Sequence, residues 1–334
     1  MARSPRMPRA GEAPVLAPPS RRAVLVGAVA GTALSGCGGQ TWDEFPPTDL
    51  TIATGNTGGV FRTYGEALAT VLGKRLAGVT VRTRGTNASV DNVGEVSERV
   101  SDIGFSLADV AADARRGSGQ WSDPVDLVTL ARAYDSFVHV VVPADSGVDS
   151  VSDLRGRRVG LGAAGSGTRG IALRALRSAG VAPRDVESVS ETLQRSADAL
   201  ADGGLDAFFF VSGLPNTAVL RLAQEVPIRL LSLDRITPRL ISDHGPEFSP
   251  SSIPASTYGL DRAVDTVSVK NYVLVRPDLD EDLAYAVTRV MFEAQSSVDL
   301  LARGVRQPNV GTAIYTAPLP LHPGALRYYR EQRS

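Results

Sequence analysis

Apolar positions in the first third of the chain alternate between two periods. Residues 50–53 and 79–84 have the composition and alternation of short strands, and residues 102–106 form a third such segment. Between the strands, apolar residues recur at spacings of three and four over 60–71 and 90–100, which is the helical period. The resulting β-α-β-α-β order predicts an open parallel sheet covered by helices.

The middle of the chain repeats this order after an extended apolar run at 137–143. The strand expected at 158–162 leads into a glycine-rich loop, and a helix is expected from about Thr168 to Gly180. The pattern further predicts strands at 187–191, 206–213, 228–234 and 266–275, and helices at 193–201, after Pro215 and at 281–294. Residues 237–258 show little periodicity. The sequence therefore predicts two similar α/β lobes, with the extended segments 137–143 and 266–275 as hinge candidates.

Two glycine-rich loops carry the candidate binding chemistry: TGNTGG (54–59) and GAAGSGTRG (162–170) each run into a predicted helix. The first amides of a helix lack intrahelical partners and carry the positive end of its dipole, and glycine lets an anion approach them closely. Neither loop has the lysine of a P-loop or the GxGxxG pattern of a dinucleotide site. Because ligands bind at the carboxyl ends of such strands, two facing loops predict a cleft for a short anion with a carboxylate at each end. Ordinary tight turns remain the alternative for either loop alone.

The N-terminal segment has the features of an export signal. Five arginines and one acidic residue, Glu12, precede the apolar stretch at 23–34, which is followed by the small residues of LSGC (34–37). This stretch is too short for a permanent membrane span, and the pattern resembles a bacterial lipoprotein signal. The resemblance implies removal of residues 1–36, lipid on Cys37 and a chain held at the outer face of the cytoplasmic membrane. SRRAVL (20–25) also resembles a twin-arginine signal, and 37–48 are interpreted as a tether.

Amino-acid composition and net charge argue against several classes of function. Cys37 is the only cysteine, so the folded part has no disulfide, cysteine metal site or cysteine nucleophile. The three histidines, His139, His244 and His322, lack the spacing of metal ligands, and a structural or surface role is predicted for each. Without residues 1–36 the chain has 298 residues and a net charge of −5, which argues against nucleic acid as a partner.

Nearly the whole mature chain resembles one receptor family. The chain contains, in this order, TIATGNTGGVFRTYGEALA, TNASVDNV, SDIGFSLADVA, VVVPADSGVDSVSDLRGRRVGLGAAGSGT, LDAFFFVSGLPN and LPLHPGALRYYRE. This set, over about residues 50–331, resembles the TAXI family of solute-binding receptors, which serve TRAP-type secondary transporters. The resemblance implies a type II periplasmic-binding-protein fold, with two lobes of mostly parallel sheet flanked by helices and a ligand cleft between them. Lobe 1 would comprise residues 49–138 and 260–334, and lobe 2 residues 139–259.

The resemblance also implies a binding protein without catalysis or cofactor. The implied ligand is a small carboxylate, either a glutamate-like amino acid or a dicarboxylate, and the implied partners are the membrane subunits of a TRAP transporter. The residues expected to contact the ligand lie at the ends of predicted strands and at the starts of predicted helices. They are Thr54, Gly55, Thr57, Gly58, Gly59, Thr86, Ser89, Asn92, Tyr134, Ser166, Gly167, Thr168, Phe210, Ser212, Gly213 and Pro215.

Some positions depart from the family pattern. Asn56, Arg62 and Arg169 stand where small, aromatic and polar or acidic residues are common. A surface role is favoured for Arg62, whereas Arg169 is left open between solvent and ligand. Asp109 is a weaker candidate for contact with a ligand amine, because a role on the helix face or as a cap fits it better.

Two other functions stay open at this point. The same fold can act as a sensor that passes ligand occupancy to a membrane histidine kinase. An exported hydrolase would need a nucleophile with a base, and although Ser166 and Ser212 lie in suggestive loops, spacing pairs neither with a His or Asp.

Overall fold

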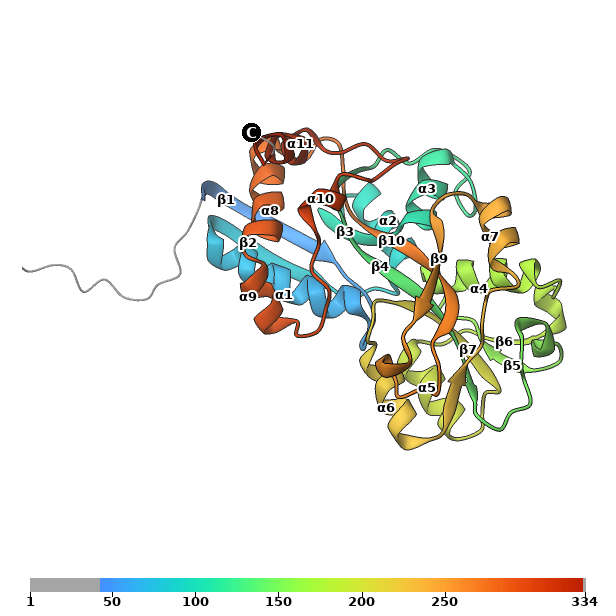
Figure 1. Ribbon diagram of the computed structural model, residues 1–334. Coiled ribbons are helices and arrows are strands. Elements are labelled where there is room, and N and C mark those ends of the chain that lie inside the picture. Colours follow the sequence, from blue (N-terminus) through green and yellow to red (C-terminus); the bar gives the residue numbers. More distant parts are fainter. Residues whose placement is uncertain (1–42, 333–334) are drawn as a thin grey trace, which may run out of the picture. The chain divides into compact units, whose positions relative to one another are not determined.

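The structure is a computed structural model that describes residues 43–332; the export signal and Cys37 lie outside these residues (Figure 1). The strands are β1 (Asp43–Ala53), β2 (Leu76–Arg84), β3 (Ile103–Leu107), β4 (Val128–Pro143), β5 (Arg158–Gly160), β6 (Glu187–Val189), β7 (Ala207–Ser212), β8 (Ile228–Leu230), β9 (Phe248–Ile253) and β10 (Val264–Val275). The α-helices are α1 (Val60–Arg75), α2 (Ser89–Ser97), α3 (Ala108–Arg116), α4 (Gly167–Ser178), α5 (Leu193–Ala201), α6 (Thr217–Glu225), α7 (Thr237–His244), α8 (Glu281–Glu293), α9 (Gln295–Leu301), α10 (Val310–Ala313) and α11 (Pro323–Glu331). Among these, no helix has the length and apolar character of a membrane span.

The strands form two sets with the same order. In the first set the order is β2-β1-β3-β10-β4, and β10 is antiparallel to both of its neighbours. In the second set the order is β6-β5-β7-β4, with β8 on the far side of β4, and β4 is antiparallel to β7 and β8. Each lobe therefore has parallel strands with one antiparallel strand inserted at the same place, which confirms the predicted two-lobe α/β architecture.

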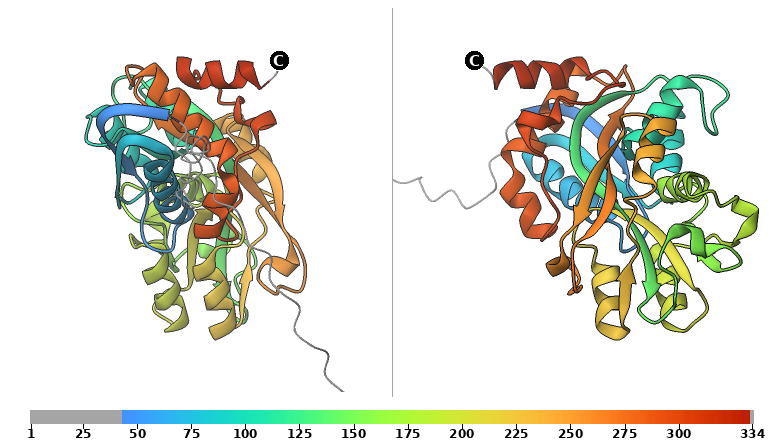
Figure 2. Two further views of the ribbon diagram at one scale, coloured as in Figure 1. Left: turned by 90° about the vertical axis from the view of Figure 1, so that its left-hand side faces the viewer. Right: turned by 45° about the vertical axis from the view of Figure 1, so that its right-hand side comes forward.

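Two long strands, β4 and β10, run from one lobe into the other (Figures 1 and 2). β10 pairs with β9 through Val269 and with β3 from Asn271 onward, and its pairing with β4 is irregular at the same point. There the buried Asn271 side chain donates hydrogen bonds to Tyr134 O (2.8 Å) and Ser136 Oγ (2.9 Å). These bonds replace the ladder bonds that the irregularity removes.

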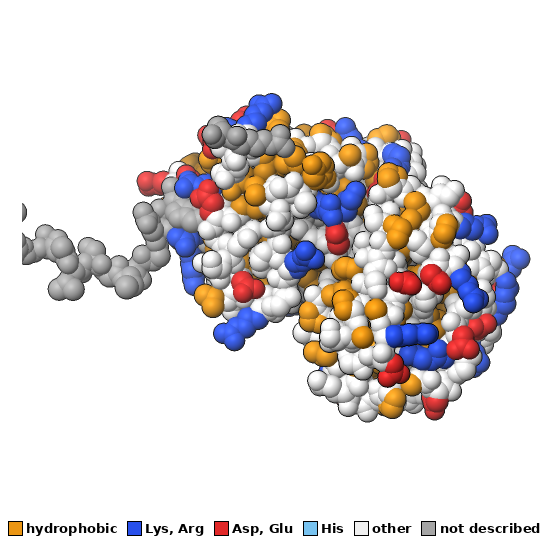
Figure 3. Space-filling model, in the orientation of Figure 1, with side chains coloured by type: hydrophobic (Ala, Val, Ile, Leu, Met, Phe, Trp, Pro, Cys, Tyr) orange, Lys and Arg blue, Asp and Glu red, His pale blue; other side chains and the backbone are white. Residues whose placement is uncertain are grey.

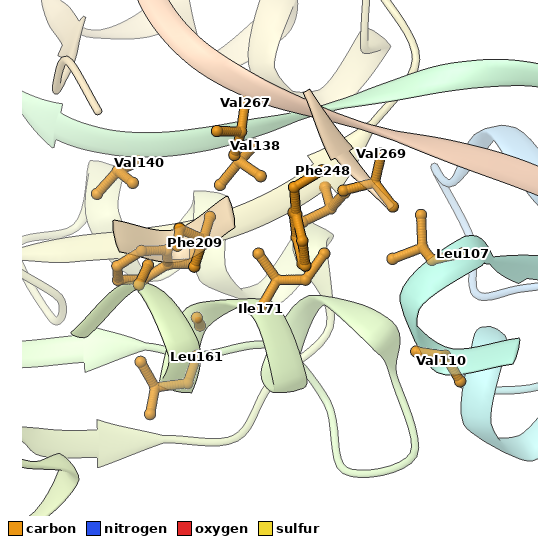
Figure 4. Packing of buried hydrophobic residues seen from close by; sticks show 14 of the residues in the cluster. Leu107, Val110, Val138, Val140, Leu161, Ile171, Phe209, Phe248, Val267 and Val269 are labelled. Carbon is orange, nitrogen blue, oxygen red and sulfur yellow. The ribbon is translucent and has the colours of Figure 1, made fainter. Parts of the chain in front are cut away.

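The apolar residues of the central strands alternate between two faces. In β7, Phe209 and Val211 belong to a core that also contains residues of α2, α3 and α4, whereas Phe208 and Phe210 face α5 and α6. Figure 4 shows the first of these cores, in which Phe209 of lobe 2 lies near Ile171, Phe248 and residues of β4 and β10. A separate core under α1, α8 and α11 covers the other face of lobe 1. Because both faces of β7 are covered, this strand has a continuous apolar run in the sequence.

The structure differs from the sequence prediction in several segments. Residues 43–48 belong to β1, so the predicted tether is wrong for these residues. β4 starts at Val128, well before the predicted apolar run, and Val100 lies beyond the end of α2 with 45% of its surface exposed. Helix α3 was not predicted, and α7 and β9 lie in the segment that lacks periodicity.

The described surface carries both signs of charge. Figure 3 shows Lys and Arg side chains interspersed with Asp and Glu over the face of lobe 2, without a field of one sign. Many of these groups form ion pairs, such as Arg158 with Asp206 at 2.8 Å and Arg155 with Asp185 at 2.8 Å. The face that Figure 3 shows has no basic stripe for a polyanion among its described residues.

Candidate ligand-binding site

A cavity lies between the two lobes, and four helices begin at its wall. Val60, Ser89, Gly167 and Leu193, the first residues of α1, α2, α4 and α5, all line the cavity. Two of these helices come from each lobe. The enclosed volume of about 50 Å³ matches a few water-sized groups, so a ligand that fits this arrangement is small.

Three of these helix starts have no side-chain cap. The residues before α1, α2 and α5 are Gly59, Ala88 and Thr192, and none of their side chains accepts a hydrogen bond from the helix. At α4, the Ser166 hydroxyl accepts the Arg169 N–H (3.3 Å), which leaves the earlier amides of that helix without this cap. Early amides of α1, α4 and α5 therefore provide donors at the cavity, and all four helix dipoles provide positive potential. At α2 the Val90 and Asp91 amides are bonded to Gly165 O.

Aromatic and hydroxyl-bearing residues form much of the rest of the cavity wall. Phe61 stacks on Phe105, with ring centroids 5.6 Å apart, and its ring centroid lies 6.4 Å from that of Tyr134. Burial raises the pKa of Tyr134 well above its ordinary value, so its phenol is neutral. Phe210 and Ser212 complete this wall from the end of β7. Among the described residues of the wall, none is Lys, Arg or His.

The structure brings nine of the sixteen predicted ligand contacts to this cavity. These are Gly55, Gly59, Ser89, Tyr134, Ser166, Gly167, Thr168, Phe210 and Ser212. Seven do not line it: Thr54, Thr57, Gly58, Thr86, Asn92, Gly213 and Pro215. All seven belong to the same loops, strand ends and helix starts as the lining residues, so the structure brings the predicted segments together at the cavity without placing these seven residues on its wall.

Buried hydrogen bonds explain three of these misses. The Thr54 hydroxyl donates to Arg84 O (2.8 Å). Asn92 donates to Thr54 O (2.6 Å) and Phe105 O (2.7 Å), and its carbonyl accepts the Thr86 hydroxyl (2.6 Å). These side chains tie β1, β2 and α2 together behind the cavity, which is a structural role.

The other misses lie beside the cavity. A wider, open groove adjoins it and shares Gly55, Asn56 and Asn87 with it; Thr57 lines this groove, as does the already mentioned Thr86. Gly213 lies against the Tyr134 ring, where an added Cβ would be 3.3 Å from the ring. Pro215 follows a cis peptide bond after Leu214, and Gly58 has a positive φ of 83°.

The charged residues singled out from the sequence do not line the cavity. Arg62 lines the outer groove and pairs with Glu66 at 2.9 Å, in keeping with the favoured surface role. Arg169 is half-buried, and its Nη1 has no hydrogen-bond partner among the described residues. Asp109 is buried and pairs with Arg174 at 2.7 Å, so its weaker candidacy for ligand contact is wrong. Burial raises the pKa of Asp109 to about 6, although Arg174 opposes this.

Sequence reasoning missed other residues of the wall. The polar ones among them are Asn56, Asn87, Ser136, Glu191 and Ser196. Asn87 follows β2 and Glu191 follows β6, so the rule that ligands bind at the carboxyl ends of strands would have found both. Ser136 lies in the middle of β4, and no local signal in the sequence separates it from other strand serines.

Direct contacts across the cavity show that the lobes are closed. Gly165 O of lobe 2 accepts the Val90 N–H (3.1 Å) and the Asp91 N–H (3.3 Å) of lobe 1. On another side, Asn216 of lobe 2 donates from Nδ2 to Gly58 O of lobe 1 (3.2 Å). Because these bonds join loops of different lobes, they form only when the lobes come together.

The cavity serines are bonded without a general base. The Ser166 hydroxyl donates to Ala163 O (2.7 Å), and Ser212 Oγ accepts from Asn216 Nδ2 (3.3 Å). His139 is buried elsewhere, between Phe137 O and the Tyr258 hydroxyl, each at 2.9 Å. His322 caps α11 by accepting the Gly324 N–H (3.1 Å). Both contacts agree with the structural roles predicted for these histidines.

Two solved structures with this fold are similar over most of the chain. A binding protein component of an ABC phosphonate transporter from Pseudomonas aeruginosa shares 10% identity over 79% of this chain and 80% of its own, with a TM-score of 0.53. PhnD1 from Prochlorococcus marinus, in complex with methylphosphonate, shares 14% identity over 76% of this chain and 89% of its own, with a TM-score of 0.51. The fold is the two-lobe fold of the type II periplasmic binding proteins. The sequence matches the NMT1-like family over residues 52–332, and the chain belongs to this family.

Proposed function

We propose that this protein is an extracytoplasmic solute-binding receptor that closes its two lobes on a small carboxylate. The observation that carries the proposal is the convergence of four helix starts, two from each lobe, on one cavity. Each start contributes roughly half a positive charge, and the starts of α1, α4 and α5 contribute amide donors; at α2 the Val90 and Asp91 amides are bonded to Gly165 O. Since no described Lys, Arg or His lines the cavity, these helix starts are its source of positive potential.

Lobe closure links ligand binding to the relative position of the two lobes. A ligand that contacts helix starts of both lobes stabilises only the closed form, because in an open form it reaches one lobe at a time. We propose lobe 1 as residues 49–138 and 260–334 and lobe 2 as 139–259, with one refinement. The change of partner strand at Lys270 favours a second crossing near that residue rather than at residue 260.

A panel of carboxylates tests the ligand class. Purified protein is heated with L-amino acids, dicarboxylates and 2-oxo acids, together with phosphonates, sulfonates and neutral sugars as controls. We expect at least one carboxylate to raise the melting temperature, because a ligand that binds only the folded form stabilises it by mass action. A rise with phosphonates or sulfonates alone, or with none of the panel, would refute the carboxylate proposal.

We further propose that the receptor serves a TRAP-type secondary transporter, as its resemblance to the TAXI family implies. The two structural neighbours are too distant to favour a transporter type. Proteoliposomes that contain the membrane subunits encoded beside this chain provide the test. Uptake that needs this receptor and a sodium or proton gradient supports the proposal, whereas uptake that needs ATP contradicts it.

Anchoring through Cys37 completes the proposal. The residue lies outside the described part of the chain, and the sequence alone supports it. We expect the mature protein to begin at Cys37 and to carry lipid there, and a Cys37→Ala variant to leave the membrane fraction. An intact mass without the lipid increment would contradict this assignment.

A further inference from the structure

One described residue of the cavity wall carries a formal charge, and that charge is negative. Glu191 lies between β6 and α5 and lines the cavity. Its loop runs beside the second glycine loop, where the Leu161 N–H donates to Val189 O (2.9 Å) and Ser190 Oγ donates to Gly162 O (3.3 Å). The residue that carries this carboxylate therefore lies on the cavity wall, in a loop held beside the second glycine loop.

A purely structural role accounts poorly for this carboxylate. Glu191 pairs with Arg195 at 3.3 Å, but the Arg195 side chain is 75% exposed, and exposed pairs of this spacing add little stability. Glu191 itself precedes Thr192, which stands at the N-cap position of α5 without a side-chain capping bond. A neutral polar residue at position 191 would leave the loop bonds intact, because the bonds named above are made by its neighbours Val189 and Ser190.

We propose that Glu191 binds the ammonium group of an α-amino acid whose carboxylate is held by the helix starts. This inference rests on the proposed function, since it concerns the same cavity. A ligand with carboxylates alone places like charge beside Glu191, whereas an ammonium group forms a charge-assisted hydrogen bond with it. Arg62 and Arg169 lie outside the cavity wall, and Arg195, the cation that pairs with Glu191, is 75% exposed, so it offsets the charge of Glu191 only weakly for an amine-free ligand.

Matched ligand pairs that differ only in the amine test this inference. The pairs are L-glutamate with glutarate and L-alanine with propionate, titrated by calorimetry. We expect wild-type protein to bind at least one amino acid about 10- to 100-fold more tightly than its deaminated partner, the range of a hydrogen bond to a charged group. In Glu191→Gln we expect this preference to disappear, through weaker binding of the amino acid and equal or tighter binding of the amine-free acid.

Two control variants separate the role of Glu191 from general charge and from helix stability. Glu187→Gln makes the same charge change on the exposed strand β6, outside the cavity wall. Arg195→Gln removes the surface partner of Glu191 while leaving its carboxylate. We expect both controls to keep the wild-type preference, and loss of the preference in Arg195→Gln would overturn the inference.

The outcomes also separate this inference from the proposed function. If glutarate or propionate binds as tightly as its amino acid in wild-type protein, Glu191 does not select an amine, and the carboxylate receptor stands. If Glu191→Gln keeps the full preference, the inference fails in the same way. If the full carboxylate panel produces neither binding nor thermal stabilisation, the proposed function fails and the inference falls with it.

Discussion

Closure can be blocked at a single glycine without altering either lobe. Gly167 is the first residue of α4 in lobe 2, and it faces lobe 1 across the cavity. A Cβ at this position would lie 2.6 Å from Leu107 Cδ1 and 2.9 Å from Ser89 Oγ. Carbon atoms in favourable contact are about 3.5–4.0 Å apart, so Gly167→Ala forces the closed lobes apart.

The size of the effect follows from the packing of these neighbours. Leu107 is 3% exposed and Ser89 is 1% exposed, so neither side chain has room to move away. Overpacking of this kind costs about 1–3 kcal/mol. The cost falls on the closed form alone, so ligand affinity should fall by about 5- to 150-fold. The unliganded protein should be equally stable or slightly more stable, because alanine favours a helix over glycine.

The same helix provides a matched control. At Gly170 an added Cβ meets no atom within 4 Å, so Gly170→Ala makes the same chemical change without the clash. The assays are calorimetry with the carboxylate that gives the largest thermal shift, and hydrogen exchange of the Val90 and Asp91 amides. In the closed form these amides are bonded to Gly165 O across the cavity, and with ligand present we expect them to exchange faster in Gly167→Ala than in wild type.

Two results would refute this reasoning. The first is an affinity of Gly167→Ala equal to that of wild type. The second is an equal loss in Gly167→Ala and Gly170→Ala, which would place the effect in the helix rather than in closure.

Two further predictions concern contacts away from the ligand. Asn216→Asp keeps an oxygen that accepts the Ala218 and Val219 amides but loses the donor to Gly58 O. We expect the affinity for the ligand to fall several-fold with little change in melting temperature. A large decrease in melting temperature would contradict a role of Asn216 in closure. Burial lowers the pKa of His139 to about 4 from 6.5. The folded protein therefore binds a proton at His139 less readily than the unfolded chain does. The neutral imidazole costs no stability above pH 6.5, and the free energy of unfolding decreases as the pH falls from 6.5 through 4, by about 3 kcal/mol in all. Thermal melts between pH 7 and 4 should show this loss in wild type and a smaller loss in His139→Gln; equal slopes would exclude His139 as the cause.

Much of the fold could be predicted because the spacing of apolar residues in its helices and strands depends only on residues close together in the sequence. The helical spacing in α1 and α8 and the continuous apolar run in β7 are set by residues a few positions apart, and burial of these residues follows. The helix and strand in residues 237–258 were not predicted, because their sequence has no such local pattern. Helix α7 buries few residues, among them Leu240, and β9 carries Ser and Pro because it pairs only along β10. Tertiary contacts, rather than propensity, hold both elements.

The candidate site was predictable by segment and not by side chain. Glycine loops followed by helices mark where an anion approaches the backbone, and Gly55, Gly59 and Gly167 do line the cavity. Asn92 has the same polar character as its neighbours, yet it turns inward to Thr54 O and Phe105 O. A residue one position away on a helix points about 100° aside, so small differences in docking decide which side chains reach the ligand.

The amino-acid sequence by itself determined the two repeated β/α units, the glycine loops at their helix starts and the export features of the N-terminus, because each depends on neighbours in the chain. Tertiary structure alone decided which residues face one another across the cavity. Gly167 meets Ser89 and Leu107, and Glu191 joins residues of lobe 1 at one wall, only because β4 and β10 carry the chain between the lobes. Contacts between residues so far apart in sequence arise from packing and leave no periodic signal.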